Sequence, residues 1–348
     1  MLDLAIILVL AVIFDLLLGD PRRWHPVVGI GNAAGFFARI LRKASGEGPA
    51  ALIAAGAATA AMTVAVCAIA AGAIVYAAAL VPKVALVSNV AFVAIVPNLA
   101  AALIVSFMIA VRSLEDHALV VYRALVREDL SFARERAGWI VGRDTHDLPE
   151  PELVRATVEC VAESISDGVS GPLFFAAVGG LIGAACLKDA GAGAAIGAAM
   201  GAVGYRAINT MDSMFGYRNA RYTFFGRVPA RLDDLANLLP ARLTVPAIIL
   251  AALIARESFV QSARIWWRDA LKHTSPNAGQ GEAAFAGALN IQLGGTNLYA
   301  GVPVVKPLIG PQDRSAPLER AHILRAVRLM FLTVLWFTIG LAGVILAL

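Results

Sequence analysis

Four charged side chains recur at four-residue steps in the middle of the chain: Arg155, Glu159, Glu163 and Asp167. Four residues advance an α-helix by about 40° beyond a full turn, so these side chains form one stripe. The stripe runs toward an apolar segment, where carboxylates are costly unless they meet cations. Since Mg²⁺ is typically held by a few carboxylates together with substrate phosphates, we expect a Mg²⁺–phosphate site. A solvated face of Arg–Glu pairs is the alternative.

A second polar stretch follows the apolar residues 190–205. Its acids, amides and arginines are Asn209, Asp212, Arg218, Arg221, Arg231, Asp233 and Asp234. Polar groups at such a boundary predict a functional site. The segment Asp233-Asp234-Leu235-Ala236-Asn237 faintly resembles the Asp-rich motif of prenyl transferases. The alternative is that Asp233 simply caps a helix.

A third polar stretch runs from His273 through Ser275 and Asn277 to Glu282, and a helix is predicted over 283–293. A polar, glycine-containing loop that leads into a helix presents free amides and the positive end of the dipole, which favour anions. An ordinary turn and cap, with Glu282 favouring the start of the helix, is the alternative.

These clusters must be positioned by membrane helices, because 59% of the 348 residues are apolar and only 16% are charged. Such a composition, with a mean hydropathy of +0.73, excludes an ordinary soluble protein and predicts an all-α, polytopic membrane protein. The three scattered cysteines exclude a disulfide scaffold. About six spans are expected, over residues 2–18, 49–80, 84–111, 171–187, 190–205 and 327–348. Gly193, Gly197 and Gly201 lie four apart, which predicts close packing against a neighbouring helix.

The positions of the arginines predict the orientation. Basic residues gather in segments 20–48 and 112–160, which places both segments in the cytoplasm and both termini outside. Residues 112–160 are expected to form a cytoplasmic layer of amphipathic helices, the second over 131–141. The apolar run 243–255 has 13 residues and contains Pro246, so a re-entrant or interfacial segment is expected there. No strand pattern of consequence is found.

The expected organisation has five parts: membrane helices over 1–111, cytoplasmic helices over 112–170, a membrane hairpin over 171–205, a polar cytoplasmic-face region over 206–326, and a terminal span over 327–348. All three polar clusters then lie on the cytoplasmic face. Arg strongly outnumbers Lys, which suits bidentate contacts with phosphate or carboxylate, although a GC-rich genome would produce the same bias. The chain has no P-loop, GxSxG or HExxH motif.

Together these stretches resemble the adenosylcobinamide-phosphate synthase family of cobalamin biosynthesis, known as CbiB or CobD. The matching segments are Gly19-Asp20-Pro21 with His25-Pro26, Trp139 to Asp144, Glu159 with Ala162-Glu163 and Asp167-Gly168-Val169, Asn209 to Met214 with Gly216-Tyr217, Phe225-Gly226 to Arg231-Leu232-Asp233-Asp234, Pro240 to Thr244, and Ser275-Pro276-Asn277 with Gly279 and Glu282. They cover nearly the whole chain in the family's order. Two departures are Ser164, where Asn is expected, and Gln280-Gly281 in place of Trp-Pro.

The resemblance implies ATP- and Mg²⁺-dependent ligation of adenosylcobyric acid with an amino-alcohol phosphate, typically (R)-1-aminopropan-2-ol phosphate. It implies an enzyme of the inner cell membrane that has a corrinoid substrate, no nucleic-acid partner, and contact with the lipid bilayer and with other enzymes of the pathway. Because a carboxylate is a poor electrophile, ATP would first convert it to an acyl phosphate, with Mg²⁺ and Arg neutralising charge.

On this basis residue roles are expected as follows. Metal ligands are expected among Glu159, Glu163, Asp167, Asp212, Asp233 and Asp234, and catalytic groups among Glu159, Glu163, Asp212 and His273. Phosphate or substrate contacts are expected from Arg143, Asn209, Arg218, Arg221, Arg231, Ser275, Asn277 and Glu282.

Two other classes of protein remain open. A transporter would place charges near the middle of its spans, whereas here they collect at one face. A membrane prenyl or phosphoryl transferase would share the Mg²⁺–diphosphate chemistry, yet it would need a second Asp-rich motif that the sequence lacks.

Overall fold

The computed structural model describes all residues except 22–24, 85–89, 217–220 and 313–316, and it divides the chain into two compact units. Unit 1 comprises Met1–Ala110, Gly171–Asn237 and Thr338–Leu348, and unit 2 comprises Val111–Ser170 and Leu238–Phe337. The division falls within the last helix, α14 (Ala321–Ala347).

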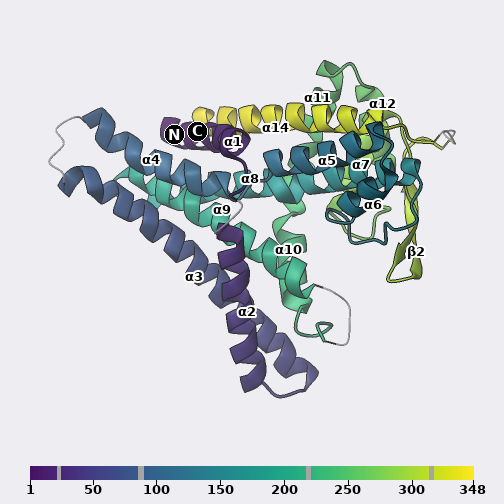
Figure 1. Cartoon of the computed structure of the whole chain (residues 1–348). Helices are drawn as coiled ribbons and strands as arrows, with labels where there is room; N and C mark the ends of the chain where they lie inside the picture. Colours follow the sequence, from purple (N-terminus) through teal and green to yellow (C-terminus); the bar gives the residue numbers. More distant parts are fainter. Residues whose placement is uncertain (22–24, 85–89, 217–220, 313–316) are drawn as a thin grey trace. The chain divides into compact units, whose positions relative to one another are not determined.

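Unit 1 is built from long helices (Figure 1). They are α1 (Leu2–Leu18), α2 (Pro26–Ala44), α3 (Pro49–Val84), α4 (Val90–Ser106), α8 (Gly171–Cys186), α9 (Ala190–Phe215) and α10 (Arg227–Ala236). Helix α2 starts where Pro26 follows His25, whose Nδ1 accepts a hydrogen bond from the Val27 amide at 3.1 Å. The Nε2 atom of His25 lies 3.1 Å from Asp20 Oδ1, so the two ends of the predicted Gly-Asp-Pro and His-Pro motif are joined.

Helices α8 and α9 pack along their length in unit 1 (Figure 1). A Cβ atom at Gly197 would lie 2.0 Å from the carbonyl oxygen of Gly179, and one at Gly201 would lie 2.0 Å from that of Phe175. Only glycine allows the two backbones to approach this closely, so the predicted packing of the glycine stripe is confirmed. Asp189, in the short turn between the helices, caps α9 by accepting from the Ala192 amide at 3.1 Å.

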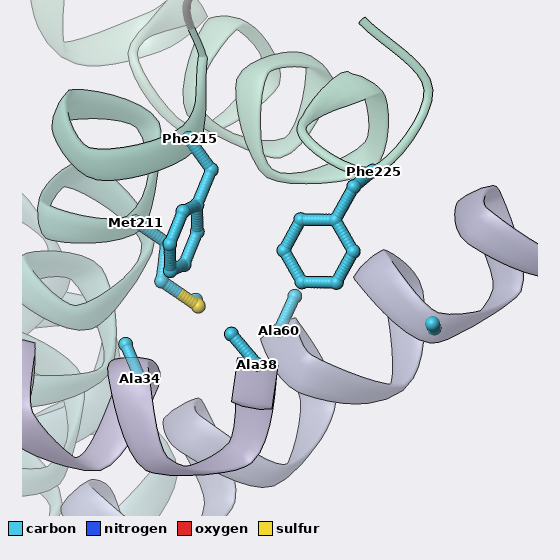
Figure 2. Packing of buried hydrophobic residues seen from close by; sticks show 7 residues of the cluster. Ala34, Ala38, Ala60, Met211, Phe215 and Phe225 are labelled. Atoms are coloured by element: carbon cyan, nitrogen blue, oxygen red, sulfur yellow. The ribbon is translucent and has the colours of Figure 1, made fainter. Parts of the chain in front are cut away.

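A buried apolar cluster joins α2, α3 and α9 to the segment before α10, as Figure 2 shows. Its members are Ala34, Ala38, Ala55, Ala60, Met211, Phe215 and Phe225. The Phe215 and Phe225 rings meet edge to face at 5.4 Å, an arrangement that aromatic pairs prefer. The small alanines of α2 and α3 leave room for these large rings, which fixes the end of α9 against both helices.

Unit 2 combines shorter helices with a β-hairpin (Figure 1). Its elements are α5 (Val111–Val126), α6 (Leu130–Ala137), α7 (Glu150–Ile165), the π-helical turn η1 (Ser166–Ser170), α11 (Leu238–Ile254), α12 (Phe259–Asp269), α13 (Ala278–Leu289), β1 (Leu293–Tyr299) and β2 (Val302–Ile309). The amphipathic helix expected after residue 112 is confirmed as α5, whereas the second helix is shorter than predicted and ends at Ala137.

The β-hairpin corrects the prediction that the chain lacks strands. Strands β1 and β2 pair in antiparallel fashion and are joined by Ala300 and Gly301, both with positive φ, as two-residue hairpin turns require. Helix α13 starts five residues earlier than predicted and stops at Asn290, which adopts the left-handed conformation common after helix ends.

Five helical segments among the described residues are long and apolar enough to span a membrane: Pro49–Leu80, Ile95–Val126, Glu150–Cys186, Arg227–Ile254 and Ala321–Ala347. The predicted class, an all-α polytopic membrane protein, is confirmed. The spans do not match the six predicted ones one for one: among the described residues no candidate covers 2–18 or 190–205, and Arg227–Ile254 is an additional one.

The segment predicted over 243–255 is longer than the sequence indicated. Helix α11 begins at Leu238, directly after α10, and continues through Pro246. Within the helix, Arg242 Nη1 donates to the Leu238 carbonyl at 2.8 Å. A re-entrant segment was expected because the apolar run 243–255 is short for a membrane span. The helix has 17 residues, so this reason is wrong.

Candidate functional site

The carboxylate of Glu159 is the centre of a buried charged network in unit 2. Its Oε1 accepts from Arg155 Nη1 at 2.9 Å, and its Oε2 accepts from Arg143. All three side chains are at most 7% exposed. A buried charge is stable only when it is paired and hydrogen-bonded. Glu159 therefore stabilises the buried charges of Arg143 and Arg155, and the two arginines stabilise the charge of Glu159. Arg155 also pairs with Glu152.

The β-hairpin completes this network through a glycine and an asparagine of β1. The Gly294 amide donates to Glu159 Oε1 at 2.7 Å, and Arg155 donates to the Gly294 carbonyl. Gly294 has φ of +88° at an irregularity in the pairing, where a Cβ atom would lie 2.1 Å from the Pro307 carbonyl oxygen. The oxygen of the buried Asn297 side chain accepts from Arg143 at 2.7 Å and from Arg155 at 2.9 Å. The strand irregularity thus turns a backbone amide onto the carboxylate.

Asp144, next to Arg143, holds the tip of the same hairpin. Its carboxylate accepts from the Ala300 amide at 3.2 Å and from the Gly301 amide at 2.7 Å, and its own amide donates to the Leu298 carbonyl at 2.8 Å. The Trp139 to Asp144 segment therefore serves as an anchor that sets the hairpin against α7.

A cavity of about 250 Å³ in unit 2 gathers the predicted stripe. It is lined by Ile140, Val141, Gly142, Arg143, Glu159, Cys160, Glu163, Ser164, Asp167, Tyr299 and Lys306. Glu163 is exposed and Asp167 is half-buried, in contrast to Glu159. Two cations and three carboxylates therefore border one small polar space, a composition suited to a phosphate accompanied by a divalent cation.

Glu282 and His273 lie in the same electrostatic environment. Burial, together with the charges of Glu163 and Glu159, raises the pKa of Glu282 to about 8, so this carboxyl is mostly protonated at neutral pH. Burial and the charge of Lys306 lower the pKa of His273, although Glu163 opposes the shift. His273 Nδ1 accepts from the Ser275 amide at 3.0 Å, which leaves the ring proton on Nε2, 3.8 Å from Glu282. The first and third sequence clusters thus meet in unit 2.

The loop before α13 is closed by its own side chains. Ser275 Oγ accepts from the Asn277 and Ala278 amides at 3.3 Å each, and Asn277 Oδ1 accepts from Arg242 Nη1 at 3.3 Å. These bonds match the alternative of a turn and cap and use two of the amides expected to bind an anion. The family departure Gln280 accepts from Trp266 Nε1 at 2.7 Å, and a Cβ atom at Gly281 would lie 2.2 Å from the Ala162 carbonyl oxygen on α7.

The second sequence cluster forms a different polar network, within unit 1. Asp233 accepts from Asn209 Nδ2 at 3.2 Å and from Asn237 Nδ2 at 3.0 Å, and the hydroxyl of the buried Tyr205 donates to Asn237 Oδ1 at 2.6 Å. Arg206 donates to Asn209 at 3.1 Å. Asp233 lies inside α10 and links it to α9, so the alternative that it caps a helix is wrong.

The remaining predicted residues of this cluster are distributed along unit 1. Burial and the charge of Asp234 raise the pKa of Asp212, which lies on the last turns of α9. Arg231 is exposed on α10, and Arg221 lines a cavity beside α2. Arg218 falls outside the described residues.

The metal ligands predicted from sequence are thus divided between the two units. Glu159, Glu163 and Asp167 belong to unit 2, whereas Asp212, Asp233 and Asp234 belong to unit 1. In the part of the chain that the structure describes, no group of three or more His, Cys, Asp or Glu side chains is arranged to hold a metal ion. Two carboxylates suffice for Mg²⁺ when phosphate and water supply its other ligands, so Glu163 and Asp167 still fit such a site.

Sequence reasoning missed two residues of the unit 2 cavity, Lys306 and Tyr299. Both lie on the hairpin, which the sequence analysis did not predict. The signal was present in Ala300-Gly301, because a two-residue turn with glycine between an aromatic residue, Tyr299, and a β-branched one, Val302, is typical of a hairpin.

Comparisons with known proteins place the chain in a family. The family model described as CobD/Cbib protein matches residues 8–330. Among curated relatives, "Cobalamin biosynthesis protein CobD" from Desulfotalea psychrophila is 42% identical over 94% of this chain and 93% of its own. The CobD protein of Geobacter metallireducens is 42% identical over 95% and 93%. "Cobalamin biosynthesis protein CbiB" from Salmonella typhimurium is 38% identical over 92% and 91%.

No solved structure matches the chain. The family match covers most of the chain, and the quoted relatives match it over almost their whole length. The chain therefore belongs to the CobD/CbiB family.

Proposed function

We propose that this membrane protein acts in cobalamin biosynthesis as an ATP-dependent ligase. It would join adenosylcobyric acid to (R)-1-aminopropan-2-ol phosphate, or a related amino-alcohol phosphate, and give adenosylcobinamide phosphate. The names of the relatives support the pathway. The observation that supports the chemistry is the unit 2 cavity, in which Arg143 and Lys306 border the same space as Glu163 and Asp167.

The reaction needs an activated carboxylate, because a propionate is a poor electrophile. The terminal phosphoryl group of ATP is transferred to a carboxylate oxygen, and ADP leaves. The amine then attacks the acyl carbon, the bond to the phosphate oxygen breaks, and the amine loses a proton as the amide forms. Phosphoryl transfer of this kind depends mainly on positioning and charge neutralisation.

The residues of the cavity fit these needs. Lys306 and Arg143 would neutralise phosphate oxygens, while Glu163 and Asp167 would hold Mg²⁺. When bound, Mg²⁺ supplies positive charge to the transferring phosphoryl group. Glu159 has both oxygens engaged by arginines and an amide, so we assign it the positioning of Arg143 in place of direct metal binding.

His273 and Glu282 are suited to proton transfer. The lowered pKa of His273 keeps its imidazole neutral, and Glu282 beside it stays mostly protonated at neutral pH. Because the Ser275 amide occupies the lone pair of Nδ1, His273 would direct its Nε2 proton at Glu282 and position that carboxyl. Glu282, whose pKa is about 8, would take the proton that the attacking amine loses.

The test uses full-length protein purified in detergent. Incubation with adenosylcobyric acid, the amino-alcohol phosphate, ATP and Mg²⁺ is expected to give adenosylcobinamide phosphate, detected by mass spectrometry, with one ADP per product. Omission of ATP is expected to abolish the product. Absence of product, together with failure to complement a strain blocked between cobyric acid and cobinamide phosphate, would reject the ligase and favour a transferase or a transporter.

A further inference from the structure

Unit 1 contains a cavity of about 470 Å³ whose lining is basic and apolar. Helix α2 contributes Gly31, Asn32, Gly35, Ala38, Arg39 and Arg42, and α9 and the segment after it contribute Met214, Phe215, Arg221, Tyr222 and Phe225. Among the described residues, the lining holds three arginines and no acidic residue. Its charge therefore favours an anion.

Two of the three arginines, Arg42 and Arg221, lie over aromatic rings. The Arg42 guanidinium lies 5.3 Å from the centre of the Phe225 ring and 5.8 Å from that of Tyr222, and Arg221 lies 5.4 Å from that of Tyr222. Stacking uses the faces of a guanidinium and leaves its N–H edges directed outward, the geometry that binds phosphate. Among the described residues, neither Arg39 nor Arg42 forms an ion pair with a carboxylate.

The cavity rests on the buried cluster of Figure 2, which includes Ala55 and Ala60 of α3. These two residues lie in the first part of the candidate span Pro49–Leu80. Since about 20 residues cross the hydrocarbon layer, the first part of this 32-residue candidate span is expected near the lipid headgroups.

The outer side of α2 is apolar next to the cavity. Val28, Phe36 and Ile40 are 60%, 51% and 49% exposed, and their spacing of eight and four residues aligns them along one side of the helix. A helix that carries basic residues beside an exposed apolar stripe is typical of an interfacial helix in contact with acidic lipids. A soluble phosphate ester would leave this stripe without a partner.

From this juxtaposition we propose that the cavity binds the phosphate of an anionic phospholipid headgroup between Arg39, Arg42 and Arg221, and that the acyl chains lie along Val28, Phe36 and Ile40. In this proposal Arg221, which the sequence predicts to contact a substrate phosphate, would contact the phosphate of the lipid. The site is independent of the proposed ligase reaction.

The test counts lipids bound to the full-length protein in detergent by native mass spectrometry. Phosphatidylglycerol is titrated beside phosphatidylcholine, and ATP and inorganic phosphate are added as competitors. The double variant Arg39→Gln/Arg42→Gln is expected to bind phosphatidylglycerol about 30-fold more weakly, the factor that two basic residues contribute near an anionic lipid surface. Lys43→Gln, on the same helix but not in the lining, removes one positive charge and is the charge-matched control for Arg39→Gln. It is expected to stay within about two-fold of wild type, because its charge lies outside the cavity.

Three results would overturn the proposal: unchanged phosphatidylglycerol affinity in the double variant, an equal loss in Lys43→Gln, or displacement of the lipid by ATP or inorganic phosphate at similar concentrations. The last result would indicate a soluble phosphate ligand. Phosphatidylcholine binding and the apparent Tm verify folding. If the double variant does not fold, Arg39→Gln alone, an exposed residue outside the aromatic stack, is expected to lose about five-fold, and unchanged affinity in that variant rejects the site.

Discussion

Glu159→Gln tests the charged network of unit 2, because this one carboxylate compensates two buried arginines. The substitution keeps the size of the side chain and removes its charge. It also replaces one carboxylate oxygen, which accepts from a guanidinium, with an NH₂ group that cannot accept. Removing one partner of a buried ion pair costs about 3–5 kcal/mol. Since Arg155 retains Glu152, we expect a loss at the lower end, about 3 kcal/mol.

This loss is measurable as a thermal shift. For a domain of this size, 3 kcal/mol corresponds to a decrease in Tm of roughly 6–12 °C. Intrinsic fluorescence of the detergent-solubilised protein reports mainly on unit 2, because four of the five tryptophans, Trp139, Trp266, Trp267 and Trp336, belong to it.

The matched control is Glu163→Gln, the same change one turn further along α7 at an exposed position. It is expected to alter stability by no more than about 0.5 kcal/mol. If Glu159→Gln melts within about 2 °C of wild type, or if the two variants shift equally, Glu159 does not hold the network as described.

Three further predictions concern the cavity, a buried carboxyl and the helix pair. Glu163→Gln combined with Asp167→Asn is expected to lower the rate of ADP release about 100-fold through loss of charge at the phosphoryl group, and a wild-type rate would reject the metal assignment. The pKa of Glu282 is raised in the folded protein, so its contribution to stability is fully present below about pH 4.5 and is lost as the pH rises through about 8. The wild-type Tm is therefore expected to fall between about pH 4.5 and 8, with a flatter profile for Glu282→Gln over the same range, and parallel profiles would contradict this. Gly197→Ala places a Cβ atom 2.0 Å from a backbone oxygen and is expected to lower the free energy of unfolding by about 1–3 kcal/mol. The control Gly204→Ala, whose Cβ would meet only Val64 at 3.7 Å, is expected to be neutral or stabilising. Equal Tm values for the two variants would refute the close packing of α8 on α9.

Hydropathy and spacing predicted the membrane class and the glycine contact, because both depend on local sequence. The same spacing predicted that Arg155 and Glu159 share a face. It did not predict that Arg143 and the Gly294 amide complete the network, because these partners are distant in sequence and depend on the hairpin. The sequence therefore favoured Glu159 as a metal ligand, whereas in the structure both of its carboxylate oxygens accept hydrogen bonds from arginines and the Gly294 amide.

The second polar cluster illustrates the same limit. Polar residues after an apolar run predicted a site, but α9 continues through Asn209 to Phe215, and amides engage the Asp233 carboxylate. Composition alone does not distinguish a carboxylate held by neighbouring amides from one directed at a ligand. The cavity beside α2 was missed because it depends on α2 packing against α9 and the segment after it.

Isotope transfer tests the proposed ligase mechanism most directly. Adenosylcobyric acid labelled with ¹⁸O in the reacting carboxylate is incubated with the amino-alcohol phosphate, ATP, Mg²⁺ and the purified protein. An acyl phosphate carries one carboxylate oxygen to phosphorus, so we predict one ¹⁸O atom in the inorganic phosphate for each adenosylcobinamide phosphate formed, with stoichiometric ADP. Unlabelled phosphate, or product formed without ATP cleavage, would contradict the proposed reaction.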